Sequence, residues 1–338
     1  MQRNAVLSLG LVAGLLACGS EPDPLEPSAQ ASLAAAAASG YTAVNLGTLG
    51  GTVSVAYDIS PVGHVVGESW TGPTGDNIHA FLWRNGVMTD LGTLGGCCSS
   101  AHGVNRAGKV VGVSTTASGA EHAFAWKDGV MTDLGTFGAS TSRASDINAA
   151  GQIVGRSGRA FRYYREQFTD LGVFSPAAIN ATGQVAGEGS SPRGYQRAVR
   201  WSNGVLTNLG TLGGNFSSAS DINADGEVVG ISTLANGKYR AFIWKNGTMK
   251  NLGVPGVLSS ASGINDAGFI VGQRQTVDNG FRAYVWCDGV STDLPSLGGK
   301  YSSANGINAA GQIVGQSRTA AGGLDATGGP FATLWVPK

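Results

Sequence analysis

Charged residues are scarce in this chain. Only 13% of its 338 residues are Asp, Glu, Lys or Arg, and 22 basic residues balance 22 acidic ones. A protein that binds nucleic acid needs clustered Lys and Arg side chains to release counterions from the phosphates. We therefore expect no nucleic-acid partner, and the same balance argues against a polybasic patch for membrane binding.

The common catalytic and zinc-binding signatures are also missing. The sequence contains no Gly-x-Ser-x-Gly, no His-Glu-x-x-His and no Cys-x-x-Cys, which carry nucleophilic or metal-assisted chemistry elsewhere. Of the four histidines, His64 and His102 are isolated in sequence, while His79 and His122 occupy a repeat position that is arginine in other units. These absences favour a protein that is not an enzyme and has no cofactor.

Cysteine is too rare to form a disulfide framework. Cys97 and Cys98 are adjacent, Cys287 lies far from them, and Cys18 belongs to the leader described next. We interpret the first three as incidental small residues. A strained disulfide between Cys97 and Cys98 is the alternative.

The N-terminal segment has the composition of an export signal. Its apolar run, residues 5–16, is too short to span a bilayer but suits the core of a signal peptide. The run ends in Leu-Leu-Ala-Cys at residues 15–18, which resembles the bacterial lipoprotein box. That resemblance implies a signal peptide at residues 1–17 and a lipid on Cys18, the alternative being an ordinary secretory signal with a chance cysteine.

The segment that follows, residues 18–40, is rich in Pro, Glu, Ser and Ala and predicts a flexible tether. A flexible tether of this length spans roughly 25 Å. Gly19 after the cysteine favours the outer membrane under the enterobacterial sorting rule. We expect an exported protein that is anchored to the bacterial outer membrane or cell surface and contacts the membrane only through its lipid.

Beyond the tether the chain repeats one unit. Glycine is abundant, with 54 residues, and a Leu-Gly step recurs at intervals of 37 to 45 residues. The leucines of this step are Leu46, Leu91, Leu134, Leu171, Leu209, Leu252 and Leu294. Periods near 40 residues with strand-like content are typical of propeller blades rather than helical solenoids.

Each unit predicts four short strands. A segment of small residues ends in an Asn-x-x-Gly turn such as Asn223–Gly226, and a β-branched strand follows it. An aromatic strand comes next, and an Asn-Gly or Asp-Gly pair then predicts a type I′ hairpin into the last strand. The third unit has Arg165-Glu166 at the hairpin, so we expect a different turn there.

The aromatic strand resembles a known repeat. The triplet His-Ala-Phe begins at His79 and at His122, and Arg-Ala-Phe or Arg-Ala-Tyr replaces it in other units. These residues resemble the HAF-repeat family of bacterial extracellular proteins, over about residues 41–338. The resemblance implies an exported repeat protein and carries no established activity.

Strand counting predicts a closed ring. The seventh aromatic strand, at residues 331–335, ends the chain without the strand that should follow it, whereas residues 41–47 supply such a strand without an aromatic strand before them. If the first strand completes the last unit, no edge is left unpaired. We therefore predict an all-β, seven-bladed β-propeller at residues 41–338, a monomer, with an open β-solenoid as the alternative.

The loops between the second and third strands vary most and carry exposed aromatic residues. Variable loops on a rigid scaffold are the usual place for binding, so Trp70, Tyr195 and Tyr239 are our candidate ligand-binding residues. We expect a lipid-anchored, non-catalytic scaffold that binds a glycan or a protein partner.

The aspartates suggest two further possibilities, a calcium site and a catalytic site. Asp221, Asn223 and Asp225 match the opening of a calcium loop, although the twelfth position is Ser232 rather than glutamate. Turn chemistry also explains them, so calcium is a secondary candidate. Asp58, Asp146 and Asp221 share one repeat position close to the expected axis. Carboxylates there could serve an extracellular hydrolase or lyase acting on polysaccharide, which is our alternative function.

Overall fold

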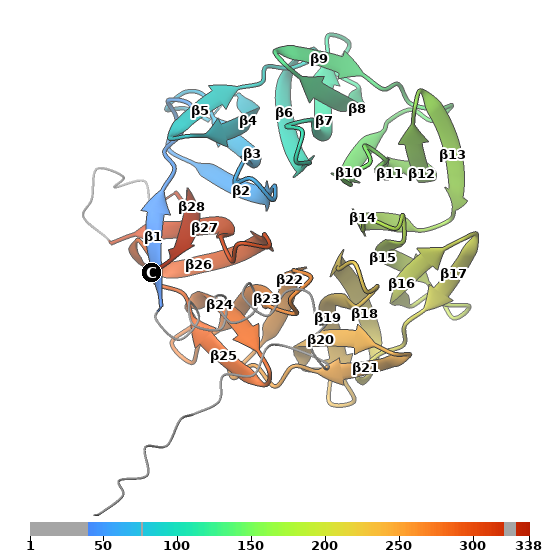
Figure 1. The fold of residues 1–338 in the computed structure, drawn as a ribbon, viewed down its shortest axis with the longest axis vertical. Helices are drawn as coiled ribbons and strands as arrows, with labels where there is room; N and C mark the ends of the chain where they lie inside the picture. The colour runs from blue at the N-terminus through green and yellow to red at the C-terminus, as the bar shows by residue number, and fades with distance from the viewer. Residues whose placement is uncertain (1–39, 76, 321–328) are drawn as a thin grey trace, which may run out of the picture.

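The structure is a computed structural model, and it describes residues 40–75, 77–320 and 329–338. The predicted signal peptide at residues 1–17, the lipidated Cys18 and all of the tether but Gly40 lie outside the described residues. Within the described part, no helix is long and apolar enough to cross a membrane. The strands form seven four-stranded blades arranged around a central axis (Figure 1).

The blades share one strand order, from the axis to the rim, and neighbouring strands of a blade are antiparallel. The first strands of blades 1 to 7 are β2 (Ser54–Ile59), β6 (Gly95–Val104), β10 (Arg143–Ile147), β14 (Ser175–Ile179), β18 (Gly213–Ile222), β22 (Ser259–Ile264) and β26 (Gly298–Ile307). The second strands are β3 (Val65–Trp70), β7 (Val110–Thr116), β11 (Ile153–Ser157), β15 (Val185–Ser190), β19 (Val228–Leu234), β23 (Ile270–Gln275) and β27 (Ile313–Thr319). The third strands are β4 (Ile78–Arg84), β8 (Glu121–Lys127), β12 (Arg159–Tyr164), β16 (Gln196–Ser202), β20 (Tyr239–Lys245), β24 (Phe281–Cys287) and β28 (Phe331–Pro337). The fourth strands are β5 (Val87–Asp90), β9 (Val130–Asp133), β13 (Gln167–Gly172), β17 (Val205–Asn208), β21 (Thr248–Asn251), β25 (Val290–Asp293) and, for blade 7, β1 (Tyr41–Asn45).

The ring closes as the strand count predicts. β1 pairs antiparallel with β28, from Tyr41 opposite Pro337 to Asn45 opposite Thr333. The blue first strand therefore lies beside the red last strands in Figure 1. The open β-solenoid is excluded, because the two ends of the repeat region share one blade.

The two ends of the blades differ in their connections, and they define two faces. The tight-turn face carries the Asn-x-x-Gly turns and the two-residue hairpins between third and fourth strands. The loop face, at the opposite end, carries the loops between second and third strands and the connections between blades. In the Asn-x-x-Gly turns the glycine has a positive φ, for example 73° at Gly108 and 77° at Gly226, as a type I turn followed by a left-handed residue requires.

The hairpin of the third blade corrects one prediction. Arg165 and Glu166 have φ values of 49° and 63°, so they adopt the same left-handed pair as Asn85-Gly86 in blade 1. The prediction of a different turn was wrong, because the pairing of β12 with β13 fixes the hairpin geometry and overrides the local preference. A side chain with a Cβ at both positions makes this the strained hairpin of the repeat.

The core lies between blades and comes mainly from the third strands. Phe81, Phe124, Phe161 and Phe242 have no exposed surface. Each lies on the third strand of its blade, as the aromatic pattern predicts. The second strands contribute a glycine where backbones meet, and a Cβ on Gly67 would lie 1.9 Å from the carbonyl oxygen of Val55. Glycine is required there by packing alone.

The turn asparagines also join the blades. Their side-chain oxygens accept backbone N–H groups of their own turns, while Nδ2 of Asn148 donates to the carbonyl oxygen of Asn180 in the next blade (3.0 Å). Asn180 in turn donates to the carbonyl oxygen of Asn223 (2.9 Å). The same bond runs from Asn105 to Asn148, from Asn265 to Asn308 and from Asn308 to Ser60. The turn motif therefore also forms a belt of amide bonds that links blades around the axis.

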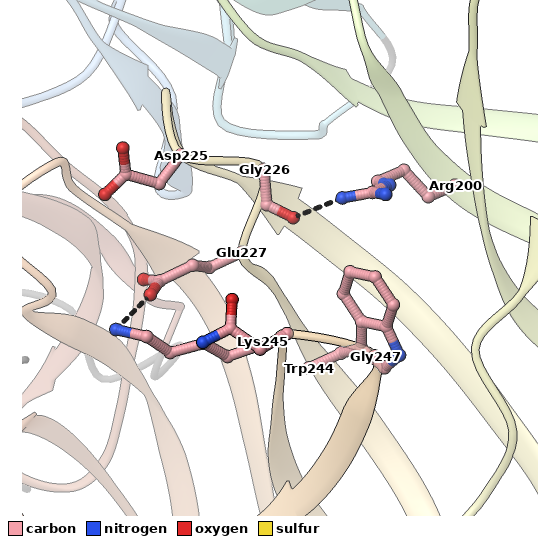
Figure 2. Close-up of a pocket in the computed structure, with 8 residues that line it drawn as sticks. Arg200, Asp225, Gly226, Glu227, Trp244, Lys245 and Gly247 are labelled. Atoms are coloured by element: carbon pink, nitrogen blue, oxygen red, sulfur yellow. Dashed lines mark hydrogen bonds and ion pairs between the residues drawn. The ribbon is translucent and has the colours of Figure 1, made fainter.

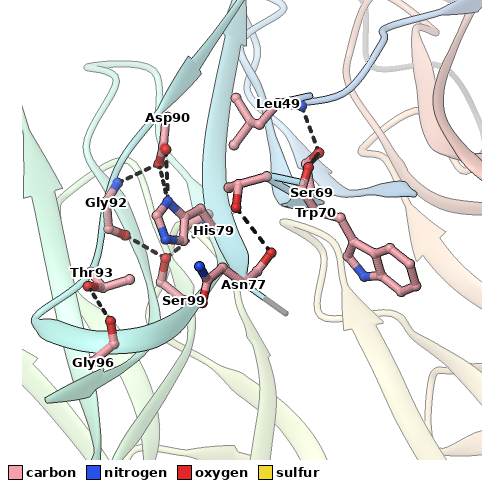
Figure 3. Close-up of polar contacts among 12 residues, drawn as sticks. Leu49, Ser69, Trp70, Asn77, His79, Asp90, Gly92, Thr93, Gly96 and Ser99 are labelled. Atoms are coloured by element: carbon pink, nitrogen blue, oxygen red, sulfur yellow. Dashed lines mark hydrogen bonds and ion pairs between the residues drawn. The ribbon is translucent and has the colours of Figure 1, made fainter. Parts of the chain in front are cut away.

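A second connection uses a serine that lies in, or just before, the first strand of most blades. Ser99 Oγ accepts the backbone N–H of Ala80 in the preceding blade (2.8 Å) and donates to the carbonyl oxygen of Gly92 (2.5 Å), the latter drawn in Figure 3. Ser142, just before the first strand of blade 3, makes the same pair of bonds with Ala123 of blade 2 and with Gly135. The alanine of the triplet is thus the donor that attaches its blade to the next one, in every blade but blade 3.

Candidate functional site

A pocket on the loop face lies between blades 6 and 7. Its volume is about 530 Å³, and we call it the loop-face pocket. It is lined by Asp278, Asn279, Gly280, Phe281, Gly298, Gly299, Lys300, Tyr301, Arg318, Thr319 and Ala320. The lining comes from the start of β24, the start of β26 and the end of β27. These segments lie together because β24 of blade 6 and β26 of blade 7 pair in parallel through Phe281 and Tyr301.

Two aromatic rings and a cation form the wall of the loop-face pocket. The ring centroids of Phe281 and Tyr301 are 5.8 Å apart with planes inclined by 54°. The guanidinium of Arg318 lies 5.7 Å from the centroid of Tyr301, within the range of a cation–π contact. Gln316 donates to the Tyr301 hydroxyl at 3.2 Å, which helps to fix the position of the ring.

Charge at the rim of this pocket is mixed. Lys300 is exposed. Asp278 accepts a hydrogen bond from the Thr276 hydroxyl (2.5 Å), and this bond is the main cause that holds the pKa of the aspartate below its usual range. Rigid aromatic surface flanked by a few polar groups is the usual make-up of a small-ligand site.

The predicted binding residues lie on the expected face but do not form one site. Trp70 is on blade 1, Tyr195 on blade 4 and Tyr239 on blade 5. Tyr195 (44% exposed) lies under the guanidinium of Arg197, and Tyr239 (41% exposed) packs edge-on against Phe216. Trp70 is partly buried and covers its own loop, since a Cβ on Gly75 would lie 2.7 Å from its ring.

Sequence reasoning missed the aromatic pair that does converge. Tyr301 follows the Gly-Gly step of its unit, where Cys98 and Phe216 stand in other units, and Phe281 precedes the Arg-Ala-Tyr triplet. Tyr301 does not belong to the variable loop on which the prediction was based, whereas Phe281 stands at the same position of its unit as Tyr239 and was passed over. The signal was available, because bulky residues at these two positions of consecutive units must meet across a blade junction.

A second pocket, of about 400 Å³, lies on the tight-turn face between blades 4 and 5 (Figure 2). The guanidinium of Arg200 stacks 4.5 Å from the ring centroid of Trp244, and its Nη1 donates to the carbonyl oxygen of Gly226 at 3.1 Å. Lys245 pairs with Glu227 at 2.5 Å. Arg200, Lys245 and Glu227 thus have partners within the pocket's own wall, which favours a role in joining the blades.

The axial aspartates occupy alternate blades and bridge to their neighbours. In each one, Oδ1 accepts the N–H of the next residue and Oδ2 accepts an N–H of the next blade. The second bond runs from Val104 to Asp58, from Ile179 to Asp146 and from Ile264 to Asp221, each at 2.8 Å. Glycine or alanine holds this position in the other blades, so each carboxylate reaches over a small residue.

The environment of these carboxylates raises their pKa values. Burial is the main cause, and it raises the pKa of Asp58 to about 6, that of Asp221 to about 7 and that of Asp146 to about 8. For Asp146 the charge of Asp58 adds to the increase. Because both oxygens of each residue already accept backbone hydrogen bonds, the arrangement serves blade bridging better than acid–base catalysis on a polymer.

Two of the candidate calcium ligands already accept backbone hydrogen bonds. Both oxygens of Asp221 accept backbone N–H groups, and the oxygen of the Asn223 side chain accepts that of Glu227. Asp225 is exposed at the turn. Among residues 40–75, 77–320 and 329–338, no cluster of three or more His, Cys, Asp or Glu side chains could hold a metal ion.

The histidines of the triplet pair with the aspartates of the fourth strand. His79 Nδ1 lies 2.8 Å from a carboxylate oxygen of Asp90 (Figure 3), and His122 Nδ1 lies 2.7 Å from Asp133. In blade 3 an arginine takes the histidine's place, and Arg159 pairs with Asp170 at 2.7 Å. The position therefore holds a hydrogen-bonding partner for the aspartate of the fourth strand.

The adjacent cysteines do not form the vicinal disulfide. Cys97 and Cys98 are both free thiols, the first exposed and the second partly buried. Hydrogen bonding from Cys98 is the main cause that lowers the pKa of Cys97.

Comparisons with known proteins give likeness of fold alone. No family model matches the sequence, and no curated protein matches it. TolB from Acinetobacter baumannii is similar in structure, with a TM-score of 0.44, 14% identity and coverage of 73% of this chain. The chain spans 55% of the length of that protein.

Two further solved structures cover more of their own length. A gluconolactonase from Xanthomonas campestris has a TM-score of 0.43 and 13% identity over 88% of this chain and 90% of its own. A TolB-like protein from Agrobacterium tumefaciens has a TM-score of 0.45 and 11% identity over 85% of this chain and 91% of its own.

Proposed function

We propose that this protein is an exported, lipid-anchored scaffold that binds a glycan through the loop face of its propeller. The observation that carries the proposal is the loop-face pocket, where the rings of Phe281 and Tyr301 converge under Arg318. Aromatic faces pack well against the C–H surface of sugar rings. Lys300 and Arg318 would pair with acidic groups on the same chain, so a glycan with carboxylates or sulfates fits best.

The proposed location of the protein depends on the N-terminal signal sequence. The lipoprotein box at residues 15–18, the tether and the resemblance to HAF-repeat proteins support export and anchoring at the outer membrane or cell surface. Replacing Cys18 with serine should release the protein from membranes. Retention of the Cys18→Ser protein in the membrane fraction would contradict the lipid anchor.

Thermal unfolding in the presence of polysaccharides tests the binding function. The mature chain with Cys18→Ser would be unfolded with a panel of neutral and acidic polysaccharides, because a ligand that binds only the folded state raises the midpoint. We expect an acidic polysaccharide to stabilise the protein by roughly 2–3 kcal/mol at a hundredfold excess over its dissociation constant. If no polysaccharide shifts the midpoint, the partner is a protein, and a pull-down from the native cell surface comes next.

Variants locate the site. Tyr301→Ala and Arg318→Gln should abolish the shift, whereas Tyr239→Ala and Tyr195→Ala remove comparable loop-face rings on blades 5 and 4 and should leave it intact. The opposite pattern would move the site to the residues predicted from sequence. Trp70→Ala is a weaker control, because this ring also packs on its own loop.

The alternative function is a hydrolase or lyase that uses the axial carboxylates. Their raised pKa values favour it, while their backbone hydrogen bonds oppose it. Any polysaccharide that binds would be assayed for cleavage by the native protein and by the double variant Asp146→Asn, Asp221→Asn. Turnover that disappears in the double variant would establish the enzyme.

A further inference from the structure

Basic side chains cluster on the tight-turn face of blades 1 and 2, although the chain as a whole carries equal numbers of basic and acidic residues. Arg84 and Lys127 precede the hairpins of the two blades, while Arg106 and Lys109 lie in the Asn-x-x-Gly turn of blade 2. Arg84, Arg106 and Lys127 are exposed. We call these four residues the basic cluster.

Two observations place members of the basic cluster around His64. A Cβ on Gly108 would lie 3.6 Å from Nδ1 of His64 and 3.9 Å from Nζ of Lys127, so the two side chains meet above this turn. After burial, the charges of Arg84 and Lys127 are the causes that lower the pKa of His64. The positive charges of blades 1 and 2 therefore act on one small area.

Few negative charges oppose the cluster. On this face of blades 1 and 2 the described turns, residues 60–64, 84–87, 105–109 and 127–130, carry one carboxylate. It is Asp128, 3.4 Å from Lys127. Acidic side chains on the same face gather in blades 5 and 6, at Asp225, Glu227, Asp266 and Asp288. The face is thus polarised, with a basic sector on one side of the ring.

Exposed valines border the basic cluster. Val87 and Val130 follow the two hairpins and are 61% and 64% exposed, and Val62 in the first turn is 49% exposed. Apolar side chains next to Lys and Arg are the composition of surfaces that lie at a membrane interface.

The path of the chain places the start of β1 on the same face. Tyr41 begins β1 opposite Pro337 at the end of β28, which is the end where the other blades form their hairpins. Blade 7 neighbours blade 1, so the chain from Cys18 joins the propeller next to the basic sector (Figure 1). A tether of this length spans roughly 25 Å, which keeps this face within reach of the surface that holds the lipid.

We propose that the tight-turn face of blades 1 and 2 docks on an anionic phospholipid membrane through the basic cluster and its bordering valines. The loop-face pocket then points away from the membrane. This revises the expectation that the membrane is contacted only through the N-terminal lipid. The proposal is independent of the glycan, because it concerns the opposite face.

Vesicle co-sedimentation tests the docking surface without the lipid. The mature chain with Cys18→Ser would be mixed with phosphatidylcholine vesicles that contain or lack phosphatidylglycerol. We expect binding only to the anionic vesicles, weakened by added salt. Each basic residue near an anionic surface contributes about fivefold in affinity, so Arg84→Gln, Arg106→Gln, Lys127→Gln combined should lower binding about 100-fold.

A matched variant controls for charge alone. Arg193, Lys238 and Lys250 are also exposed and lie away from the basic cluster, so their combined replacement by glutamine removes the same charge. We expect this control to bind anionic vesicles nearly as well as the parent. Equal binding by the two triple variants, or no preference of the parent for phosphatidylglycerol, would overturn the proposal. Thermal unfolding of each variant confirms that it is folded.

Discussion

Asp146 in blade 3 accepts the backbone N–H of Ile179 in blade 4 at 2.8 Å, and its other carboxylate oxygen accepts the N–H of Ile147 at 2.6 Å. The same bridge joins blade 1 to blade 2 and blade 5 to blade 6. Because the ring has an odd number of blades, this alternation leaves blade 7 without a partner. There Asn305 donates to the carbonyl oxygen of Ala56 in blade 1 at 2.8 Å.

The first prediction concerns stability and pH. Burial raises the pKa values of Asp58, Asp221 and Asp146 to about 6, 7 and 8 from an ordinary 3.8. The folded state therefore retains protons that the unfolded chain has lost, and this stabilising contribution is complete below pH 3.8 and lost as pH rises through these values. Each retained proton gives a slope of up to about 1.4 kcal/mol per pH unit. We expect unfolding midpoints to fall from pH 5 to pH 9.

Asp146→Asn isolates the largest contribution. The free energy of unfolding of this variant should depend less on pH than that of the parent, since asparagine does not titrate. At pH 5 it should also be lower, because an oxygen that accepts a hydrogen bond between blades is replaced by an amide group that donates. Asp225→Asn, at an exposed turn, is the control and should follow the parent curve. If the free energy of unfolding falls equally with pH in the parent and in Asp146→Asn, Asp146 is not the source of the pH dependence.

The second prediction concerns the amide belt. Asn180→Ala removes the bond to the carbonyl oxygen of Asn223, which keeps only the Gly226 N–H, and leaves the Gln184 N–H of its own turn without its acceptor. We expect a loss of about 2 kcal/mol in the free energy of unfolding, measured by urea denaturation. Asn105→Ala removes a longer bond, 3.4 Å, to Asn148 and should cost less. Equal losses at both sites would mean that the turn, rather than the bond between blades, sets the cost.

The third prediction concerns the strained hairpin. Glu166 has a φ of 63°, which is unfavourable for any residue with a Cβ. Glu166→Gly should therefore raise the free energy of unfolding by about 0.5–1 kcal/mol. The reciprocal change, Gly129→Glu, places a side chain at the same hairpin position in blade 2 (φ 91°) and should lower stability by a similar amount. A loss of stability in Glu166→Gly would show that its side chain has a role that outweighs the strain.

The fourth prediction concerns the closing strand. Tyr41 is 5% exposed and packs in one core cluster with Trp335. A mature chain shortened to begin at residue 46 loses this strand and should unfold at least about 10 °C lower, because core packing and a whole ladder of hydrogen bonds disappear. A chain that begins at residue 40 keeps the strand and should match the parent.

A subtler change tests the same residue. The Tyr41 hydroxyl is buried without a hydrogen-bond partner. Tyr41→Phe should be neutral or should stabilise the protein by up to about 1 kcal/mol, because an unpaired buried polar group is removed. A clear loss of stability would mean that the hydroxyl has a partner, such as bound water.

Much of the fold could be predicted because each repeat unit contains residue pairs that are specific for its turns. The Asn-x-x-Gly and Asn-Gly pairs fix where strands end, and the unmatched strand at residues 41–47 fixes how the ring closes. The prediction of a different turn at Arg165-Glu166 was wrong because it used only the turn preference of these two residues. The pairing of β12 with β13 decides the hairpin geometry instead. The second role of Asn180, a bond between blades, has no local signature at all.

The site was harder to predict because it depends on which blades are neighbours. Tyr195 and Tyr239 were chosen for exposure in loops, and each packs with a residue of its own blade. Tyr301 and Phe281 are 20 positions apart in sequence yet meet at a blade junction. Likewise Arg84 and Lys127 are unremarkable in sequence and come together only because their blades stand side by side.

The pairing of β1 with β28 also sets an order of events for the nascent chain. Blades 1 to 6 are each built from one continuous stretch, so they can form as the chain emerges. Blade 7 needs residues from both ends and can form only after Pro337 has been made. Until then β1 has no partner strand, and a chain that has lost its last strand cannot close the ring. Completion of the propeller therefore reports that the whole polypeptide has been made.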